Sequence, residues 1–427
     1  MLIQKLNKTV NRNAWVIIRA FLLCLSFSIV SSSAAYSQST ISITGVIKDK
    51  KGETIPGAAV YLSGYKIATV ANNDGRFTIG NLKPGNYELL VQVIGFLPQN
   101  KNVVLFDKSV DVSIIMAENV TELSEVVIKA DPNRQRYIDM FKMYFIGTTP
   151  NAKQCKILNP EVIQTDYDKS KRLLTVTATD FLLIENKALG YRIRYLLNYF
   201  ENDEKANVVF YSGHPHFEEF EKKVSRQKKF AKPRAIAYAG SSQHFFASLY
   251  NNRSREEGFQ IKKIAKIPNK ARLSDDVINA NIERLSRTYY GDSKLNGVFT
   301  DSLRYWRHMR SEPATLSVLN KAEVSVDTLV KQLYKNVKSI AYSDALYVIY
   351  TNERETVEFT NLSGHSVSRP LDIPNYQISI VYQLLSPASF YENGGIFDPR
   401  ALLYEGFWAY EKVADMVPMD YIPSTNK

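Results

Sequence analysis

Residues 45–60 read Gly-Val-Ile-Lys-Asp-Lys-Lys-Gly-Glu-Thr-Ile-Pro-Gly-Ala-Ala-Val, and this stretch decides the fold of the N-terminal part of the chain. It joins the end of a segment in which apolar and polar residues alternate, residues 41–48, to the start of another apolar segment. Alternation with a period of two is typical of a β-strand that is buried on one face. Between the two segments, Gly52, Pro56 and Gly57 favour chain reversals. The stretch therefore predicts two strands connected by tight turns.

The same pattern of short alternating segments and turn residues continues to residue 118. Asn72-Asn-Asp-Gly75 predicts a tight hairpin that uses positive φ angles, and Asn81-Leu-Lys-Pro-Gly85 predicts a further turn. About seven short strands at this spacing predict a two-sheet β-sandwich over residues 41–118. The expected strands include residues 41–48, 59–62, 68–70, 76–79, 87–93 and 109–116.

Four patterns in this region resemble the carboxypeptidase regulatory-like domain: G-V-I-x-D-x-x-G-x-x-I-P-G-A-x-V, N-D-G-R-F-T-I, L-K-P-G-N-Y-E-L and G-F. The resemblance implies a transthyretin-like sandwich. Such a domain is appended to metallocarboxypeptidases and is common at the start of exported proteins of Gram-negative bacteria, including TonB-dependent nutrient receptors. It implies a structural or partner-binding module without catalytic residues. The residues that carry the pattern form turns, namely Gly52, Pro56, Gly57, Asp74, Gly75, Pro84 and Gly85.

Residues 121–129, Thr-Glu-Leu-Ser-Glu-Val-Val-Ile-Lys, resemble the stretch that links this domain to the plug of TonB-dependent receptors and includes the TonB box. A last edge strand followed by a linker, residues 119–136, is the alternative that we favour. About 290 residues then remain, whereas a plug and a barrel of 22 strands at ~10 residues per strand need far more. We therefore expect a second domain that is not a receptor barrel.

The composition of the 427 residues excludes several classes of protein. Hydrophobic residues make up 45% and charged residues 23%, which argues against wholesale disorder and against a polytopic membrane protein. The 26 Tyr and 21 Phe residues favour a β-rich architecture. Two cysteines are too few for a disulfide-stapled scaffold or a multi-cysteine zinc site.

The N-terminus has the three zones of a secretory signal peptide. Four basic residues precede an apolar stretch, residues 20–30, and small residues follow it. We expect cleavage after Ala35 or Ser37, so that residues 1–37 are removed. Leu23 precedes Cys24 where a lipobox has a small residue, which argues against a lipid anchor. Removal takes away four positive charges and leaves +7 of the formal +11. We expect an exported protein without a transmembrane span in the mature chain, located in the periplasm, at the outer membrane or on the cell surface.

Residues 137–427 predict a larger α+β domain with an antiparallel sheet and a helical insertion. Apolar residues at helical spacing predict a helix over 137–145, and alternation in 191–200 predicts a sheet with one wet face. A helical part is expected from about Glu218 to Asn251, broken near Lys232-Pro233, with helical or irregular chain to about residue 335. The other expected strands are 173–178, 181–185, 207–211, 339–350, 356–361 and 376–384, before an aromatic-rich element at 402–417.

Three segments of this domain look like those of exported bacterial proteins that carry the same N-terminal domain. They are residues 145–155, 184–191 and 408–421. That family comes without an assigned activity. The resemblance therefore supports the domain layout and implies no mechanism.

His216-x-x-Glu219, within the run His214-Pro-His-Phe-Glu-Glu219, matches the first two zinc ligands of metallocarboxypeptidases. A zinc site with an open position needs a third protein ligand. The remaining histidines are His244, His308 and His365, and neither of the last two lies at the spacing of that family. The interpretation that we favour is that His214-Pro-His216 closes a strand and leads into a helix whose start is stabilised by Glu218 and Glu219.

Other catalytic constellations are incomplete. No G-x-S-x-G elbow or phosphate-binding loop is present, and Gly240-Ser-Ser-Gln-His244 predicts ordinary polar positions on one helix. Cys155 could act as a nucleophile, but a small buried residue is the more common role of a single cysteine beside a helix end.

Two groups of residues suit binding. A basic run could contact lipid head groups, lipopolysaccharide or cell-wall polymers, although a solvated helix face interrupted by Glu218, Glu219 and Glu221 is favoured. Aromatic pairs could stack on sugars, although core positions are favoured for them. The basic run comprises Lys222, Lys223, Arg226, Lys228, Lys229, Lys232 and Arg234, extended by Lys262, Lys263, Lys266, Lys270 and Arg272; the aromatic groups are Tyr289-Tyr290, Tyr305-Trp306 and Phe407-Trp408 with Tyr410.

The sequence thus predicts a non-catalytic exported envelope module whose sandwich binds a protein partner or an envelope polymer. We expect no cofactor and no nucleic acid. The alternatives are a zinc-dependent carboxypeptidase-like hydrolase that uses His216 and Glu219, and a carbohydrate-binding protein.

Overall fold

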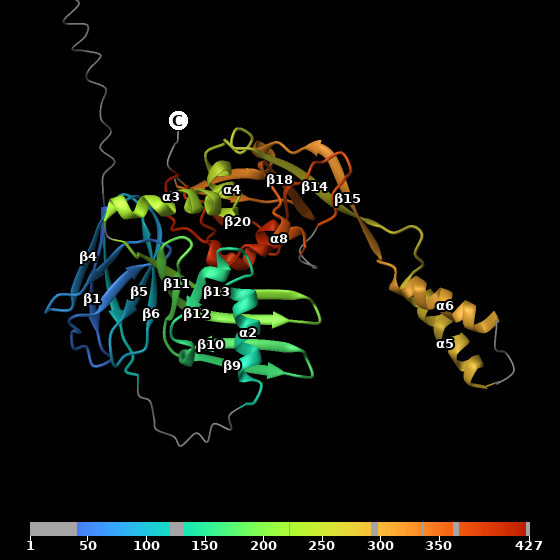
Figure 1. The fold of residues 1–427 in the computed structure, drawn as a ribbon, viewed down its shortest axis with the longest axis horizontal. Helices are drawn as coiled ribbons and strands as arrows, with labels where there is room; N and C mark the ends of the chain where they lie inside the picture. Colours follow the sequence, from blue (N-terminus) through green and yellow to red (C-terminus); the bar gives the residue numbers. More distant parts are fainter. Residues whose placement is uncertain are drawn as a thin grey trace, which may run out of the picture.

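The computed structural model describes residues 41–119, 131–221, 223–291, 298–334, 336–361 and 367–423 (Figure 1). Several features predicted from the sequence lie outside these residues. They are the signal peptide with Cys24, the 121–129 stretch, Lys222, His365 and the side chains of Tyr289 and Tyr290.

The N-terminal part is the predicted seven-strand β-sandwich. One sheet has the order β4-β1-β7 and the other has the order β3-β2-β5-β6. Alternating burial along β1 places its apolar residues between the two sheets. The strands are β1 (Ile41–Lys48), β2 (Ala59–Leu62), β3 (Ala68–Val70), β4 (Arg76–Leu82), β5 (Gly85–Gln92), β6 (Gln99–Leu105) and β7 (Val110–Ile115).

The turns of the sandwich differ in detail from the prediction. The turn at 72–75 is present, but it joins β3 to β4, which lie in different sheets, so it is not a hairpin. The Asn72 side chain closes it by accepting hydrogen bonds from the backbone N–H groups of Asp74 and Arg76. Gly75 has a φ of 69°, and an added Cβ would lie 2.8 Å from the Ile47 carbonyl oxygen. Gly85 begins β5 without a positive φ, so its expected role in relieving a turn is wrong.

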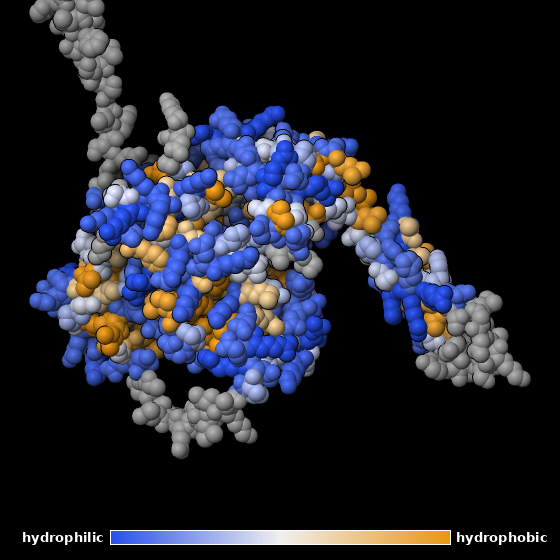
Figure 2. Space-filling model, in the orientation of Figure 1, coloured by the Kyte–Doolittle hydropathy of each residue, from blue (hydrophilic) through white to orange (hydrophobic). Residues whose placement is uncertain are grey.

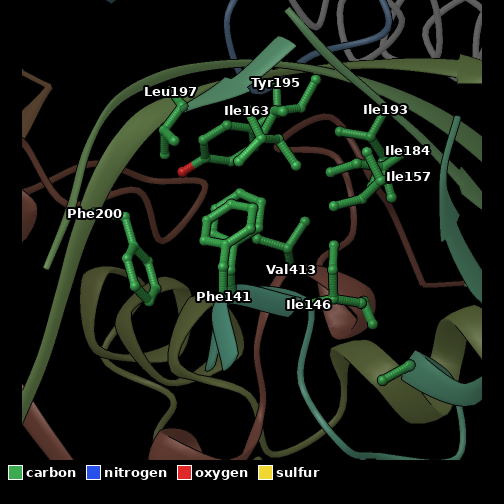
Figure 3. Close-up of a cluster of buried hydrophobic side chains, with 14 of the residues drawn as sticks. Phe141, Ile146, Ile157, Ile163, Ile184, Ile193, Tyr195, Leu197, Phe200 and Val413 are labelled. Atoms are coloured by element: carbon green, nitrogen blue, oxygen red, sulfur yellow. The ribbon is translucent and has the colours of Figure 1, made fainter. Parts of the chain in front are cut away.

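The second part is a six-stranded antiparallel sheet covered on one face by α2 (Arg134–Phe145). Its order is β8-β11-β12-β10-β9, with β13 beside β12. Figure 3 shows Phe141 of α2 and Val413 of the C-terminal segment among the apolar side chains of this sheet. The strands are β8 (Cys155–Ile157), β9 (Ile163–Asp168), β10 (Leu173–Ala178), β11 (Leu182–Asn186), β12 (Tyr191–Asp203) and β13 (Val208–Glu219), with short 3-10 turns η1 (Ala152–Gln154) and η2 (Pro160–Val162).

The third part contains a five-stranded sheet of order β15-β14-β18-β19-β21 and a small sheet β16-β17-β20. The helices α5 (Asp275–Gly291) and α6 (Val298–Ser311) project from the body on the ribbon formed by β14 and β15 (Figure 1). The other elements are α3 (Val224–Tyr238), α4 (Ser242–Tyr250), β14 (Phe259–Pro268), β15 (Thr315–Glu323), α7 (Val326–Leu329), β16 (Val330–Tyr334), β17 (Val337–Ile340), β18 (Ala345–Arg354), α8 (Val357–Thr360), β19 (Tyr376–Gln383), β20 (Ala388–Phe390), η3 (Pro399–Ala401), β21 (Leu402–Gly406), α9 (Phe407–Tyr410) and η4 (Val413–Asp415).

The α+β class is as predicted, but several element assignments were wrong. The run 214–219 continues β13 and does not begin a helix. Pro233 lies inside α3, and the break falls at Gly240, whose φ is 74°. The strands β14 and β15 occupy chain that was expected to be helical or irregular, and α8 replaces the strand expected at 356–361. Among the described residues, no helix is long and apolar enough to cross a bilayer.

Candidate functional site

The run His214 to Glu219 lies in β13, where the six-stranded sheet meets the sandwich. The Gly64 N–H donates to the Pro215 carbonyl, and the Phe217 N–H donates to the Tyr65 carbonyl over 3.1 Å. The turn between β2 and β3 therefore pairs with the outer edge of β13. Tyr61 and Leu90 of the sandwich also pack on Phe181 and the sheet. The sheet face that was expected to be wet is thus partly covered.

His216 lies inside this contact. Its side chain is 2% exposed, and its ring centroid lies 4.6 Å from that of Tyr61. Burial lowers the pKa of His216 to about 4, against the opposing charge of Glu218. Glu218 in turn forms an ion pair of 2.6 Å with Arg194 on β12. His216 is therefore a neutral packing residue near pH 7.

Glu219 lies on the other face of the strand, because residues three apart in a strand point in opposite directions. Its carboxylate pairs with Lys66 of the sandwich at 3.3 Å and with Arg234 of α3 at 3.4 Å. Arg234 is buried, lies 4.0 Å above the centre of the Tyr191 ring, and donates to the Leu189 carbonyl over 2.8 Å. The structure does not bring His216 and Glu219 around a common point.

A third polar contact of this interface centres on His214. Its Nδ1 lies 2.9 Å from a Glu88 oxygen of β5, and its Nε2 lies 2.9 Å from the amide nitrogen of Asn198. Burial acts to raise the pKa of Glu88, but the hydrogen bond and charge of His214, with a hydrogen bond from Asn100, outweigh it and lower that pKa. The interface between sandwich and sheet is therefore polar as well as apolar.

His244 has both ring nitrogens occupied by structural partners. Its Nδ1 accepts from the Gly240 N–H over 3.0 Å, and its Nε2 lies 2.9 Å from a Glu257 oxygen. Ser241 is the N-cap of α4 and accepts the His244 backbone N–H. The serine and the histidine therefore occupy the start of one helix, and the ring has no nitrogen free to activate a hydroxyl.

The remaining candidates also have structural surroundings. Cys155 is half-buried, and burial raises the pKa of its thiol to about 12, so the thiol stays protonated. Trp408 and Tyr410 are buried, whereas Tyr305 is exposed on α6 beside Trp306. Among the described residues, no three His, Cys, Asp or Glu side chains lie close enough together to hold a metal ion.

In the basic run, the residues differ in their surroundings. Lys223, Arg226, Lys228 and Lys229 are exposed on or next to α3, in contrast to the buried Arg234. Glu221 lies 3.5 Å from Arg226 and 4.0 Å from Lys229. One acidic residue therefore offsets part of the positive charge.

A buried cluster around Asp415 was not anticipated. The Thr149 hydroxyl donates to Asp415 over 2.9 Å and the Asn151 amide over 3.0 Å, while the Lys412 N–H donates over 3.3 Å. The Asn186 amide donates to the neighbouring Ala414 carbonyl over 2.8 Å. Burial raises the pKa of Asp415 to about 6, and these donors counteract the rise.

This cluster joins the three segments 145–155, 184–191 and 408–421, which lie far apart in the sequence. Of the three polar residues that meet here, Thr149, Asn186 and Asp415, only Asp415 stands between apolar neighbours in the sequence, and such a residue needs a partner when buried. That signal was available for Asp415, but nothing in the sequence says which polar residues it meets.

An open groove of about 580 Å³ lies beside the β12–β13 hairpin. Two aromatic rings, Tyr199 and Phe210, line it with charged and aliphatic side chains. The rest of its lining is Glu201, Leu384, Leu385 and Arg400.

Comparison with known proteins finds a family model that matches the N-terminal part and relatives that align with part of the chain. Residues 43–128 match the model of the CarboxypepD_reg-like domain. This chain is 31% identical over 124 residues to TonB-dependent receptor P39 of Formosa agariphila, which covers 29% of this chain and 11% of the receptor. It is 32% identical over 107 residues to TonB-dependent receptor SusC of Bacteroides thetaiotaomicron, which covers 25% of this chain and 10% of the receptor. The chain thus aligns with about a tenth of the length of these relatives.

Among solved structures, the minor pilin GBS52 of Streptococcus agalactiae has a TM-score of 0.18 at 18% identity and covers 19% of this chain and 45% of the pilin. Hydroxyquinol 1,2-dioxygenase of Pseudomonas putida DLL-E4 has a TM-score of 0.16 at 10% identity and covers 20% of this chain and 58% of the enzyme. Similarity this low supports no inference about function.

The buried His216 predicts a loss of stability in acid. The unfolded chain binds a proton near the ordinary pKa of 6.5, whereas the folded protein resists it down to about 4. The contribution of this residue is therefore present above pH 6.5 and is lost as the pH falls through 4, by roughly 2 kcal/mol at pH 4.5. Urea unfolding between pH 7 and 4.5 should show a flatter pH dependence in His216→Gln than in the wild type. Equal slopes would contradict the assignment.

The Asp415 cluster predicts that loss of one of its hydrogen-bond donors lowers the stability of the fold more at high pH than at low pH, the opposite of the His216 effect. Thr149→Val removes a donor that favours the ionised carboxylate, and leaves a buried charge less satisfied, at a cost of about 1–3 kcal/mol. Because the folded pKa is about 6 and the ordinary value is 3.8, the cost should be largest at pH 7.5 and should shrink toward pH 4.5. Urea unfolding measures it. Thr177→Val on the exposed face of β10 is the control and should change stability little. A cost that does not depend on pH would exclude the proposed role of the carboxylate charge.

Proposed function

We propose that the protein is a non-catalytic module of the bacterial cell envelope whose sandwich docks a protein partner. The relatives of the sandwich are TonB-dependent receptors, which supports an envelope setting. Under this proposal residues 1–37 are a signal peptide, 41–118 the docking domain, 119–136 a linker and 137–427 the domain that holds the sandwich in place.

The observation that carries the proposal is the way the sandwich is held. The sheet β3-β2-β5-β6 packs its outer face on the six-stranded sheet, through Tyr61 and Leu90. The sheet β4-β1-β7 lies on the far side, with β4 and β7 as its terminal strands (Figure 1). Terminal strands offer backbone N–H and C=O groups to which a partner strand can add.

The basic run competes as a docking surface for anionic envelope polymers. Its exposed members on or next to α3 are Lys223, Arg226, Lys228, Lys229 and Lys232, and two of them, Arg226 and Lys229, already pair with Glu221. Arg234, which would complete the run, is directed inward to Glu219. These contacts reduce the field available to a polymer, and they favour the sandwich.

Export predicts a processed N-terminus. Sequencing of the protein from the envelope fraction should find Tyr36 or Gln38 as the first residue, according to cleavage after Ala35 or Ser37. An intact Met1, or recovery of the protein from the cytoplasm, would remove the envelope setting.

The edge of β7 predicts the effect of one substitution. Ile115 is 62% exposed in this strand, and Ile115→Lys should reduce partner capture at least tenfold, because a charge on a terminal strand opposes strand addition. The assay is capture from envelope extract at low and high salt, with mass spectrometry of the retained protein. The control Ile94→Lys, in the exposed loop after β5, should leave capture unchanged.

The same assay tests the competing surface. In Lys228→Glu with Lys229→Glu, capture should persist at both salt concentrations. Capture that salt abolishes, and that depends on these lysines and not on Ile115, would assign docking to α3 instead.

A further inference from the structure

The arm, defined as residues 259–323, consists of the ribbon β14–β15 and the helices α5 and α6 at its far end. It leaves the body on the side away from the sandwich (Figure 1). Its helices have a small core of their own, with Ile278, Leu285 and Leu303 buried. The surface of the ribbon is not explained by the sandwich or by the Asp415 cluster.

One face of the ribbon is apolar and uncovered by the described residues. Within the body this face buries Phe259 and Ile261 in the core. It continues outward as two cross-strand pairs, Ala265 with Val318 and Ile267 with Leu316. Ile267, Leu316 and Val318 are 44%, 42% and 44% exposed, and Figure 2 shows apolar residues along this ribbon.

The opposite face of the same ribbon is partly covered. Ile264 and Leu319 pack against the buried cluster that contains Tyr347, and the Lys266 ammonium lies 5.8 Å from the centre of the Tyr382 ring. The two faces therefore differ in their partners although both carry apolar side chains. A two-stranded ribbon is only marginally stable in water unless its apolar face packs against something. An apolar face that no described residue covers therefore marks a surface for interaction.

The arm also accounts for most of the net positive charge of the chain beyond residues 1–37. It contains twelve Lys and Arg residues and seven Asp and Glu residues, a net charge of +5 of the +7 that remains without residues 1–37. Arg307 and Arg310 are exposed on α6, and Lys263 lies on the same face of the ribbon as Ala265 and Ile267. Tyr305 adds an exposed aromatic ring.

We propose that the arm binds the surface of an anionic lipid bilayer, with its uncovered ribbon face in the boundary between head groups and acyl chains. A bilayer surface provides anionic groups for Lys and Arg and an apolar layer for Ile267, Leu316 and Val318, and it needs no matching pocket. A second copy is disfavoured as the occupant because two arms of net charge +5 repel each other. Attachment would be peripheral, and it is independent of the partner proposed for the sandwich.

Vesicle flotation tests this proposal with the chain from Gln38 onward, which contains every described residue and lacks the apolar leader. The vesicles contain either phosphatidylcholine alone or phosphatidylcholine with phosphatidylglycerol at 7:3. At 0.1 M salt the protein should float with the anionic vesicles at least tenfold better than with the neutral ones. Binding should fall as salt rises to 0.5 M, because the Debye length shortens from ~10 Å.

Substitutions then locate the surface. Ile267→Asn with Leu316→Asn should reduce flotation at least tenfold, as should Arg307→Glu with Arg310→Glu. The matched controls are Val357→Asn with Leu371→Asn, exposed apolar residues of the body, and Lys228→Glu with Lys232→Glu on α3. Both controls should float like the wild type, and circular dichroism should show that all variants are folded.

Several results would overturn the proposal. They are the absence of flotation with anionic vesicles, equal flotation with neutral vesicles, and undiminished flotation of the folded arm variants. Loss of flotation in the α3 variant alone would assign the contact to α3. Binding to soluble polyphosphate without binding to vesicles would show that the arm recognises polyanions and not a bilayer.

Discussion

The buried carboxylate of Asp415 is the interaction on which the arrangement of the described residues depends. It anchors the C-terminal segment to Thr149 and Asn151, in the loop between α2 and η1. From that point the segment places Val413 in the core of the six-stranded sheet. Toward the N-terminus it continues into Trp408 and β21 of the five-stranded sheet, and toward the C-terminus it bonds Met419 to Gly64 of the sandwich. One short segment therefore contacts all three parts of the molecule.

A charged group is a costly choice for such an anchor, because burial disfavours the ionised form. The donors of Thr149, Asn151 and Lys412 offset that cost only when they lie within hydrogen-bond distance of the carboxylate. The carboxylate therefore favours one arrangement of the segments 145–155, 184–191 and 408–421. An apolar residue at 415 would pack in several ways. Nearby, burial lowers the pKa of Lys412 to about 8. The cluster thus specifies the relative placement of the sheets, although the buried charge itself costs stability near pH 7.

The sandwich could be predicted from the sequence because its information is local. Each turn carries its own residue, as Gly75 does, and the alternation of β1 needs no knowledge of the rest of the chain. The strand β6 was missed because only Val103 and Leu105 in it are buried, so its alternation is short. The course of β13 was mistaken because His214, His216 and Glu218 look like surface residues. They face a second, polar layer of protein, and sequence patterns cannot distinguish such a layer from water.

The same limit explains the candidate site. The spacing of His216 and Glu219 suggested a shared zinc ion, but spacing has this meaning only once the element is known: in a strand the two side chains diverge. The Lys-rich sequence of β14 likewise suggested a solvated region. In the structure it is a strand of a ribbon, and each face of the ribbon carries both lysines and apolar residues. Residue types could be read correctly in both cases, and the error lay in the period assigned to them.

The contacts between the parts give a physical reason to consider the two proposed surfaces together. The sandwich is fixed to β13 by backbone pairing, by the Lys66–Glu219 ion pair and by the Glu88–His214 contact, so its orientation on the six-stranded sheet is set at several points. The C-terminal segment fixes that sheet to the one from which the arm projects. The sandwich edge and the arm lie at opposite ends of this body (Figure 1). A partner docked on the sandwich would therefore lie on the side of the molecule away from the bilayer that we propose for the arm.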